Sequence, residues 1–111
     1  MTTDILQTIV AHKRTEITHQ EEAVSHDFLI RQLETNPSRP TKSLKQASAS
    51  SPTGIIAEFK RRSPSKGWIA PEADPAIIVP GYEQAGASGI SVLTDQEFFG
   101  GRLKDLQTVR P

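Results

Sequence analysis

The 111 residues of this chain suffice for one domain at most. Thirteen basic residues balance thirteen acidic ones, so the net charge gives no reason to expect nucleic acid or an anionic membrane surface as a partner. Cysteine is absent, which excludes disulfides, thiolate nucleophiles and zinc–thiolate sites. No apolar run approaches the roughly 18 residues that a membrane helix needs. We therefore expect a cytoplasmic setting and no membrane association.

The first part of the chain is predicted to be helical. A loose apolar stripe predicts one helix over residues 4–22. A second helix is expected to start at Ser25 and to stop at Asn36, because a residue that precedes proline disfavours the α region. The two histidines of the first helix lie seven residues apart, which does not suit metal ligation, so we expect no metal site there. Residues 38–54 are interpreted as a connector with one helical turn over residues 44–47.

Residues 55–60, Ile-Ile-Ala-Glu-Phe-Lys, are the most informative stretch. The branched apolar residues predict a strand, in which side chains two positions apart share a face. Glu58 and Lys60 are therefore expected to lie side by side at the carboxyl end of the strand, with the alternate residues forming a packing face. Parallel α/β sheets and barrels place their chemistry at this end. A plain ion pair is the alternative interpretation.

A long basic loop, residues 61–73, follows this strand. Loops in βα units usually have about 2–6 residues, so this length is typical of a functional loop. We expect Arg61 and Arg62 to be solvated, and Lys66 to approach a ligand if the loop moves. The same segment in isolation is also compatible with a solvated loop or with a phosphate contact.

The next helix is predicted to begin at Asp74, a capping carboxylate, with Pro75 at the first helical position. Pro80 falls inside this helix, where proline costs about 3 kcal/mol or more. We therefore expect a kink there, or a first turn that is separate from the rest. Gly86 is expected at the carboxyl-terminal cap.

A second short, branched run over residues 89–94 predicts a strand. Strand, loop, helix and strand at this separation indicate a βαβ unit with parallel pairing and a right-handed crossover. A loop over residues 95–101 and a helix over residues 102–110 follow. Two parallel strands do not close a sheet, so we interpret the chain as part of a larger α/β protein.

Several segments, taken together, resemble the indole-3-glycerol phosphate synthase family. The match is ordered and correctly spaced over residues 55–110, and the N-terminal helices fit less specifically. The matching segments are Ile-Ile-Ala-Glu-Phe-Lys at 55–60, Ser-Pro-Ser-Lys-Gly at 63–67, Tyr-Glu-Gln-Ala-Gly-Ala at 82–87, Ile-Ser-Val-Leu-Thr-Asp at 90–95 and Phe-Phe-Gly-Gly at 98–101.

The resemblance implies an α/β fold that is the N-terminal part of a (β/α)8 TIM barrel with extra N-terminal helices, incomplete in this chain. Residues 1–54 would form the helical extension and connector, and residues 55–111 the first two βα units. A whole barrel needs about 250 residues. The remainder of the barrel is therefore an expected partner, and self-association is expected when it is missing.

The same resemblance implies an activity. The family, a decarboxylating carbon–carbon lyase of tryptophan biosynthesis, converts the small phosphorylated substrate 1-(2-carboxyphenylamino)-1-deoxyribulose 5-phosphate into indole-3-glycerol phosphate, carbon dioxide and water. No metal or organic cofactor is expected. Residue by residue, the matching positions imply catalytic roles for Glu58 and Lys60, and substrate-binding roles for Ser63, Lys66, Leu93 and Phe99.

Two departures from the family pattern accompany this match. Pro80 interrupts a helix that the family usually continues. The later catalytic residues and the phosphate site would lie beyond residue 111, so we expect this chain alone to be inactive. One alternative is a non-catalytic module that binds phosphate or nucleic acid through the basic loop 61–67. Another is a truncated gene product without a role of its own, which the composition leaves open.

Overall fold

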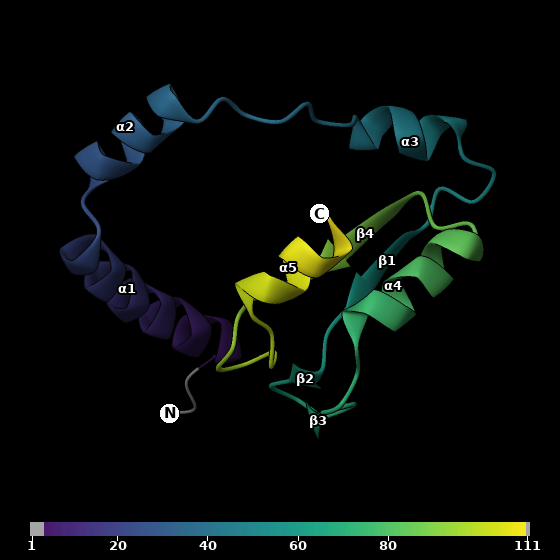
Figure 1. The fold of residues 1–111 in the computed structure, drawn as a ribbon. Helices are drawn as coiled ribbons and strands as arrows, with labels where there is room; N and C mark the ends of the chain where they lie inside the picture. Colours follow the sequence, from purple (N-terminus) through teal and green to yellow (C-terminus); the bar gives the residue numbers. More distant parts are fainter. Residues whose placement is uncertain (1–3, 111) are drawn as a thin grey trace. The chain divides into compact units, whose positions relative to one another are not determined.

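The computed structural model describes residues 4–110, shown as a ribbon in Figure 1. The chain divides into two compact units, one ending at Thr41 and the other beginning at Lys42. This division falls inside the predicted connector, ahead of α3. The expected domain boundary at 54/55 stays a prediction. No helix among residues 4–110 is both long and apolar enough to cross a membrane.

The first unit consists of two helices, α1 (Ile5–Ala23) and α2 (His26–Thr35). Asp4 caps α1, because its carboxylate accepts a hydrogen bond from the backbone N–H of Leu6 at 3.0 Å. Ser25 caps α2 in the same way through the N–H of Phe28, at 3.1 Å. The helix ends at Thr35, and its cap residue Asn36 is extended and directly precedes proline. Both predicted helices are confirmed.

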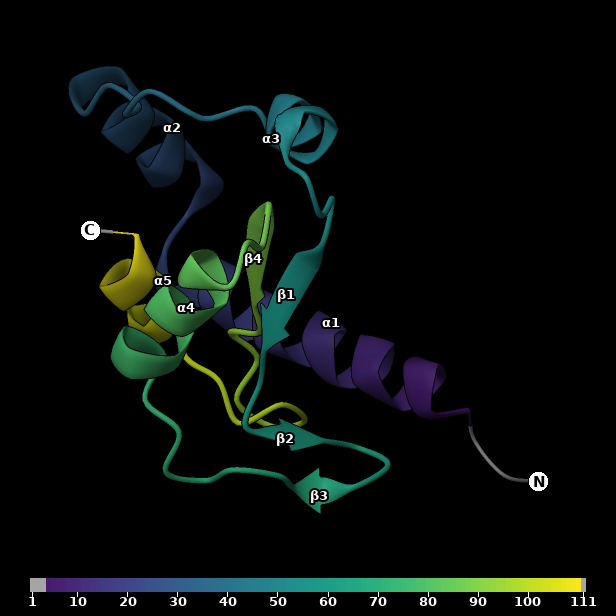
Figure 2. The same ribbon diagram turned by 90° about the vertical axis from the view of Figure 1, so that its right-hand side faces the viewer.

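The second unit is built around a parallel pair of strands, β1 (Ile56–Phe59) and β4 (Gly89–Val92). Figure 2 shows the two strands running side by side. The chain connects them through α4 (Pro75–Gln84), and α5 (Leu103–Val109) follows β4. The predicted βαβ unit with parallel pairing is therefore confirmed. Within residues 42–110, this sheet contains two strands.

The connector holds α3 (Leu44–Ser50), which is longer than the single turn expected. Ser43 caps it by accepting a hydrogen bond from the N–H of Gln46 at 3.1 Å. This helix packs where β4 begins, since a Cβ at Gly89 would come within 2.5 Å of Leu44 Cδ1. The absence of a side chain at Gly89 thus allows α3 to approach the sheet.

Helix α4 begins as predicted, with Asp74 Oδ1 accepting from the N–H of Ala76 at 3.0 Å. The expectation of a separate first turn is wrong, because the helix runs as one element through Pro80. Val79, just before the proline, is only 7% exposed, so tertiary packing holds the turn that the proline weakens. Gly86, with φ of 102°, follows the cap residue and donates to the carbonyl of Glu83, which ends the helix.

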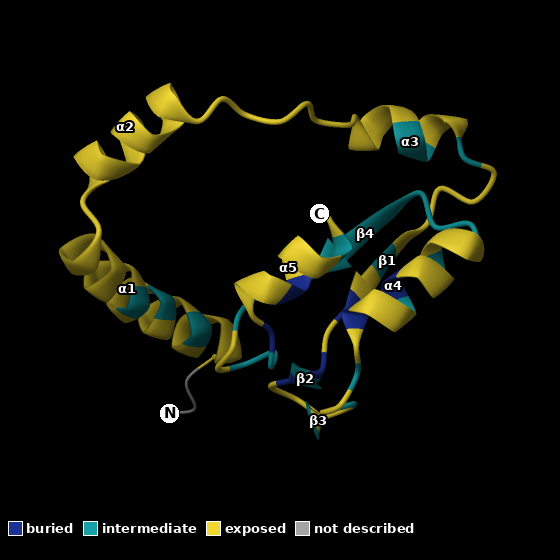
Figure 3. Ribbon diagram, in the orientation of Figure 1, coloured by how far each residue is buried: buried dark blue, intermediate teal, exposed yellow. Residues whose placement is uncertain are grey.

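The core of this unit lies between the sheet and α4 (Figure 3). Phe59 and Val79 are its buried apolar residues, 2% and 7% exposed. Phe59 and half-buried Ala57 belong to one face of β1, while Ile56 and Glu58 on the alternate face are exposed. The predicted packing face is confirmed at Ala57 and Phe59 but not at Ile55, which precedes the strand and is 58% exposed. The charged face of the strand is the one that α4 does not cover.

Candidate functional site

The carboxyl end of β1 presents the two opposite charges together. Lys60 Nζ lies 3.8 Å from Glu58 Oε1, and the two side chains are 38% and 48% exposed. The prediction that these side chains share a face is confirmed. Partial exposure leaves both charged groups accessible to a small molecule, which a buried structural ion pair would not allow.

Ser91 completes this group of side chains, and the sequence analysis missed it. Its Oγ donates a hydrogen bond to Glu58 Oε2 at 3.0 Å. The parallel register places Ser91 directly opposite Glu58. The alternation of residues 90–92 gives Ser91 a different face from its two apolar neighbours, which was a signal in the sequence. Only the register of the two strands shows that this serine lies beside Glu58. Glu58 is thus held between a hydroxyl on one oxygen and an ammonium near the other.

The loop after Lys60 contains a short hairpin that was not predicted. Its strands are β2 (Arg62–Ser63) and β3 (Gly67–Trp68), paired antiparallel. Ser63 is buried, and its Oγ accepts a hydrogen bond from the N–H of Lys66 at 3.1 Å, which closes the turn. The Lys66 side chain is exposed, and within residues 4–110 no hydrogen bond or ion pair joins it to Glu58 or Lys60.

Arg61 is only 6% exposed, so the expectation that this side chain is solvated is wrong. Its guanidinium donates to both carboxylate oxygens of Asp105, at 2.5 and 2.9 Å. It also donates to the carbonyls of Ala73 and Gly100, at 3.0 and 3.1 Å, so Asp105 and two backbone groups replace the lost water. The hydrogen bonds from Arg61 lower the pKa of Asp105, and those to Asp105 raise the pKa of Arg61.

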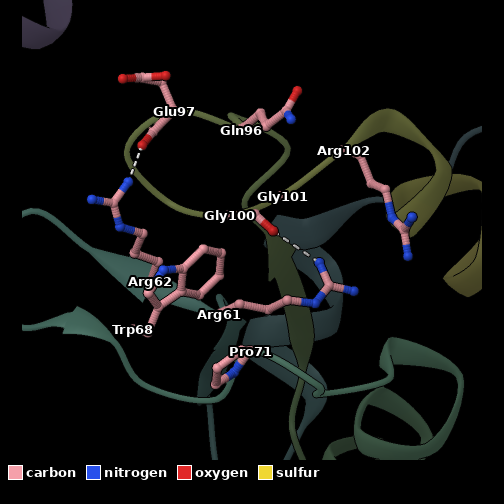
Figure 4. Close-up of a pocket in the computed structure, with 9 residues that line it drawn as sticks. All are labelled: Arg61, Arg62, Trp68, Pro71, Gln96, Glu97, Gly100, Gly101 and Arg102. Carbon is pink, nitrogen blue, oxygen red and sulfur yellow. Dashed lines mark hydrogen bonds between the residues drawn. The ribbon is translucent and has the colours of Figure 1, made fainter.

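Arg62 is half-buried, so it also departs from the expected solvated state. Its guanidinium donates to the carbonyl of Glu97 and lies over the Trp68 ring, with 5.6 Å from Cζ to the ring centroid. Figure 4 shows these side chains on the wall of an open cavity of about 500 Å³, which Gly100 also lines. The Nε of Arg62 is buried, with no hydrogen-bond partner among residues 4–110.

The two predicted apolar site residues lie around the end of β4. The N–H of Leu93 donates to the carbonyl of Phe59 at 3.1 Å, which extends the strand pairing by one residue. Leu93 and Phe99 are half-buried. A Cβ at Gly101 would lie 1.9 Å from the carbonyl oxygen of Leu93, so only glycine allows the chain to pass there. The missing side chain at Gly101 thus allows the 95–101 loop to return to the end of β4.

Comparison with known proteins identifies the relatives of this chain. Residues 6–111 match the family model of indole-3-glycerol phosphate synthase. The chain belongs to the indole-3-glycerol phosphate synthase family. It is similar to the enzyme of that name from Bacteroides thetaiotaomicron, with 56% identity over 108 residues, covering 97% of this chain and 41% of the relative. The Prochlorococcus marinus (strain AS9601) enzyme is 42% identical over 107 residues, covering 96% of this chain and 36% of the relative.

A Parafrankia relative of the same name is 61% identical over 56 residues, which cover half of this chain and 21% of that protein. The chain thus spans about two fifths or less of the length of these relatives. Indole-3-glycerol phosphate synthases are TIM-barrel proteins, and the parallel β1–α4–β4 unit is part of such a barrel. The predicted fold class is confirmed.

Proposed function

We propose that this chain provides the first two βα units of an indole-3-glycerol phosphate synthase, a carbon–carbon lyase of the cytoplasm. The reaction closes the pyrrole ring of 1-(2-carboxyphenylamino)-1-deoxyribulose 5-phosphate and releases carbon dioxide and water. Family membership supports this proposal, together with one observation. The ammonium of Lys60 lies 3.8 Å from the carboxylate of Glu58 on the uncovered face of β1, at the carboxyl end where TIM barrels act.

We propose that Lys60 binds the substrate carboxylate and takes part in proton transfer. A compact ammonium on a flexible stem can follow a carboxylate while it leaves as carbon dioxide. In a closed barrel that excludes water, such a cation would stabilise developing charge far better than bulk solvent does. Glu58 holds this ammonium in place, and the hydroxyl of Ser91 orients Glu58 in turn through its 3.0 Å hydrogen bond.

Four further residues are proposed to bind the substrate. Ser63 and Lys66 sit on the hairpin that follows Lys60, and the exposed ammonium of Lys66 is suited to an anionic group. Leu93 and Phe99 are half-buried apolar residues at the end of β4, and they are suited to an aromatic ring. The rest of the barrel would supply the remaining catalytic groups and the phosphate site.

A chimera tests this function. The chain is joined to the part of the Bacteroides thetaiotaomicron protein that follows the matched region, and the product is called here the completed barrel. We expect it to form indole-3-glycerol phosphate, and this chain alone to form none. A smaller exchange, which places only residues 55–110 into the relative, covers the case in which the larger chimera fails to fold. A folded exchange protein without activity would overturn the proposal.

The alternative is a module that binds phosphate or nucleic acid through residues 61–67. This alternative depends on free cations in the loop. Arg61 is neutralised by Asp105, and Arg62 is half-buried against Trp68 and the carbonyl of Glu97. Lys66 is the remaining exposed cation of the loop. Steeply salt-dependent binding of nucleic acid by the chain would favour this alternative.

A further inference from the structure

Two loops carry most of the proposed substrate-binding residues, and they touch each other. The 62–68 hairpin holds Ser63 and Lys66, and the 95–101 loop holds Phe99. Their backbones are joined by the N–H of Arg62, which donates to the carbonyl of Phe99 at 3.2 Å. A single backbone hydrogen bond contributes little net stability, so side chains must contribute if the two loops are to keep one relative position.

Arg62 makes the second link between the loops. Its guanidinium donates to the carbonyl of Glu97, two residues before Phe99 in the 95–101 loop, as Figure 4 shows. Arg62 therefore forms hydrogen bonds to that loop at two points, from its backbone to Phe99 and from its side chain to Glu97. Two separated points restrain rotation of the loop, which a single point cannot do.

Trp68 makes the third link. A Cβ at Gly100 would lie 2.8 Å from Trp68 Cζ3, so the indole rests directly on the glycine backbone. Gly100 has φ of 65°, a conformation that favours glycine, and the bare backbone leaves room for the ring. The Arg62 guanidinium lies 5.6 Å from the centroid of the same ring. Figure 4 shows the two side chains beside each other.

We propose that Arg62 and Trp68 are positioning residues that clamp the 62–68 hairpin to the 95–101 loop, and so hold Ser63 and Lys66 in register with Phe99. This inference rests on the proposed function for its effect on substrate, and on the contacts alone for its effect on the loops. Among residues 4–110, no hydrogen bond or ion pair joins Arg62 or Trp68 to Glu58 or Lys60. The clamp acts on substrate binding rather than on the chemical step.

The test uses the completed barrel with Arg62→Ala, Arg62→Lys, Trp68→Ala and Trp68→Phe. For Arg62→Ala we expect KM to rise roughly tenfold, with kcat within about twofold of wild type. Amide hydrogen exchange over residues 63–67 and 96–100 should accelerate roughly ten- to hundredfold, the factor that a hydrogen bond from a charged donor contributes. Trp68→Phe keeps a ring on Gly100, so its KM and exchange rates should stay closer to wild type than those of Trp68→Ala. Arg62→Lys should give a KM and exchange rates between those of wild type and Arg62→Ala.

Arg102→Ala is the matched control. This arginine lines the same cavity, but its side chain donates to Asp105, and among residues 4–110 no hydrogen bond or ion pair joins it to the 62–68 hairpin. Its removal should leave KM and the exchange rates unchanged. A comparable rise of KM in Arg102→Ala would identify the cavity as an anion-binding site and overturn the clamp.

The outcomes separate the clamp from the proposed function. If the completed barrel is folded but inactive, the proposed function fails. The clamp is then still tested by comparing the hydrogen-exchange rates of Arg62→Ala and wild type. If it is active, and Arg62→Ala leaves both KM and exchange unchanged, the clamp is wrong while the function stands. A drop in kcat at constant KM, with a lower thermal midpoint, would indicate a loss of general stability and would also overturn the clamp.

Discussion

Neighbouring cations on one loop have different environments in this protein. Lys60 is partly exposed beside Glu58, whereas Arg61, the next residue, is buried against Asp105. Alternation along the extended chain turns successive side chains to opposite sides. The planar guanidinium suits the buried position, because it can donate to a carboxylate and to backbone carbonyls at once. Lys60 occupies the accessible position, where its compact charge can contact a ligand.

The proposed role of Lys60 predicts a large kinetic effect. In the completed barrel, Lys60→Ala should lower kcat by about 10²–10⁴, the range for loss of a positioned proton-transfer group. Steady-state formation of indole-3-glycerol phosphate measures this effect. Lys104→Ala removes an exposed lysine from α5 and serves as the control, with wild-type rates expected. Wild-type rates in Lys60→Ala would remove the catalytic assignment.

The buried pair of Arg61 and Asp105 predicts a stability effect that depends on pH. Asp105→Asn leaves the Arg61 charge without its counterion, so the free energy of unfolding should fall by about 3–5 kcal/mol at neutral pH. Chemical denaturation of the completed barrel measures the loss. Glu97→Gln, which changes an exposed carboxylate in the same region, should stay close to wild type.

The pKa of Asp105 determines the direction of this pH dependence. Hydrogen bonds from Arg61 lower the pKa of Asp105 in the folded state below its ordinary value of 3.8. The ionised carboxylate therefore stabilises the fold fully above that ordinary value, and the contribution is lost as pH falls towards the lowered pKa. The gap between wild type and Asp105→Asn should be constant above about pH 5 and narrow in acid. A gap that widens in acid would contradict the assignment.

Helix α4 is specified mainly by its ends. Asp74 and Pro75 begin it, Gly86 follows it, and a proline in its interior does not divide it. Caps supply hydrogen bonds that the helix cannot make for itself, and these bonds involve residues only two or three apart. Such signals are local, so they can be recognised in the sequence. The effect of Pro80 depends on burial of Val79 and could not be recognised in this way.

The cap of α4 gives a prediction at this scale. Asp74→Ala should lower the free energy of unfolding of the completed barrel by about 0.5–2 kcal/mol, because the N–H of Ala76 loses its acceptor. Asp74→Asn keeps an oxygen acceptor and should lose much less. Thermal or chemical denaturation compares the two variants. An equal loss in both would attribute the effect to the charge of Asp74 rather than to the cap.

Most elements were predictable from their residues, and the exceptions share a cause. The helices 4–22 and 102–110 and both long strands agree with the structure to within about two residues. The β2–β3 hairpin was missed, because two-residue strands such as Arg62–Ser63 carry no periodic pattern. In the site, the shared face of Glu58 and Lys60 was predicted, whereas the hydrogen bond from Ser91 and the burial of Arg61 were not.

At the scale of the whole molecule, the sheet formed by residues 42–110 has two strands, and each strand presents an unpaired edge. The face opposite α4 exposes Ile56, at 52%. An open strand edge beside an exposed apolar side chain is a surface on which another chain can pair. In a closed barrel the same edges would be paired and the same face would line the interior.

This surface predicts the behaviour of the chain by itself. We expect residues 1–111, expressed alone, to self-associate or to unfold without a cooperative transition. Sedimentation velocity and thermal melting followed by circular dichroism measure both properties. The completed barrel is the control, and it should melt cooperatively. A monomeric 111-residue species with a sharp cooperative transition would contradict the prediction.

The amino-acid sequence by itself determined the helices, the two parallel strands, the family, and the shared face of Glu58 and Lys60. The helices, the strands and the shared face follow from patterns that repeat every two or four residues and from neighbouring caps, which need no knowledge of distant parts. The family was indicated by the resemblance of the segments within residues 55–110. Only the tertiary structure decided that Arg61 is buried against Asp105, 44 residues later, and that Ser91 meets Glu58 across the strands. Such pairings depend on register and loop path, which no local pattern encodes.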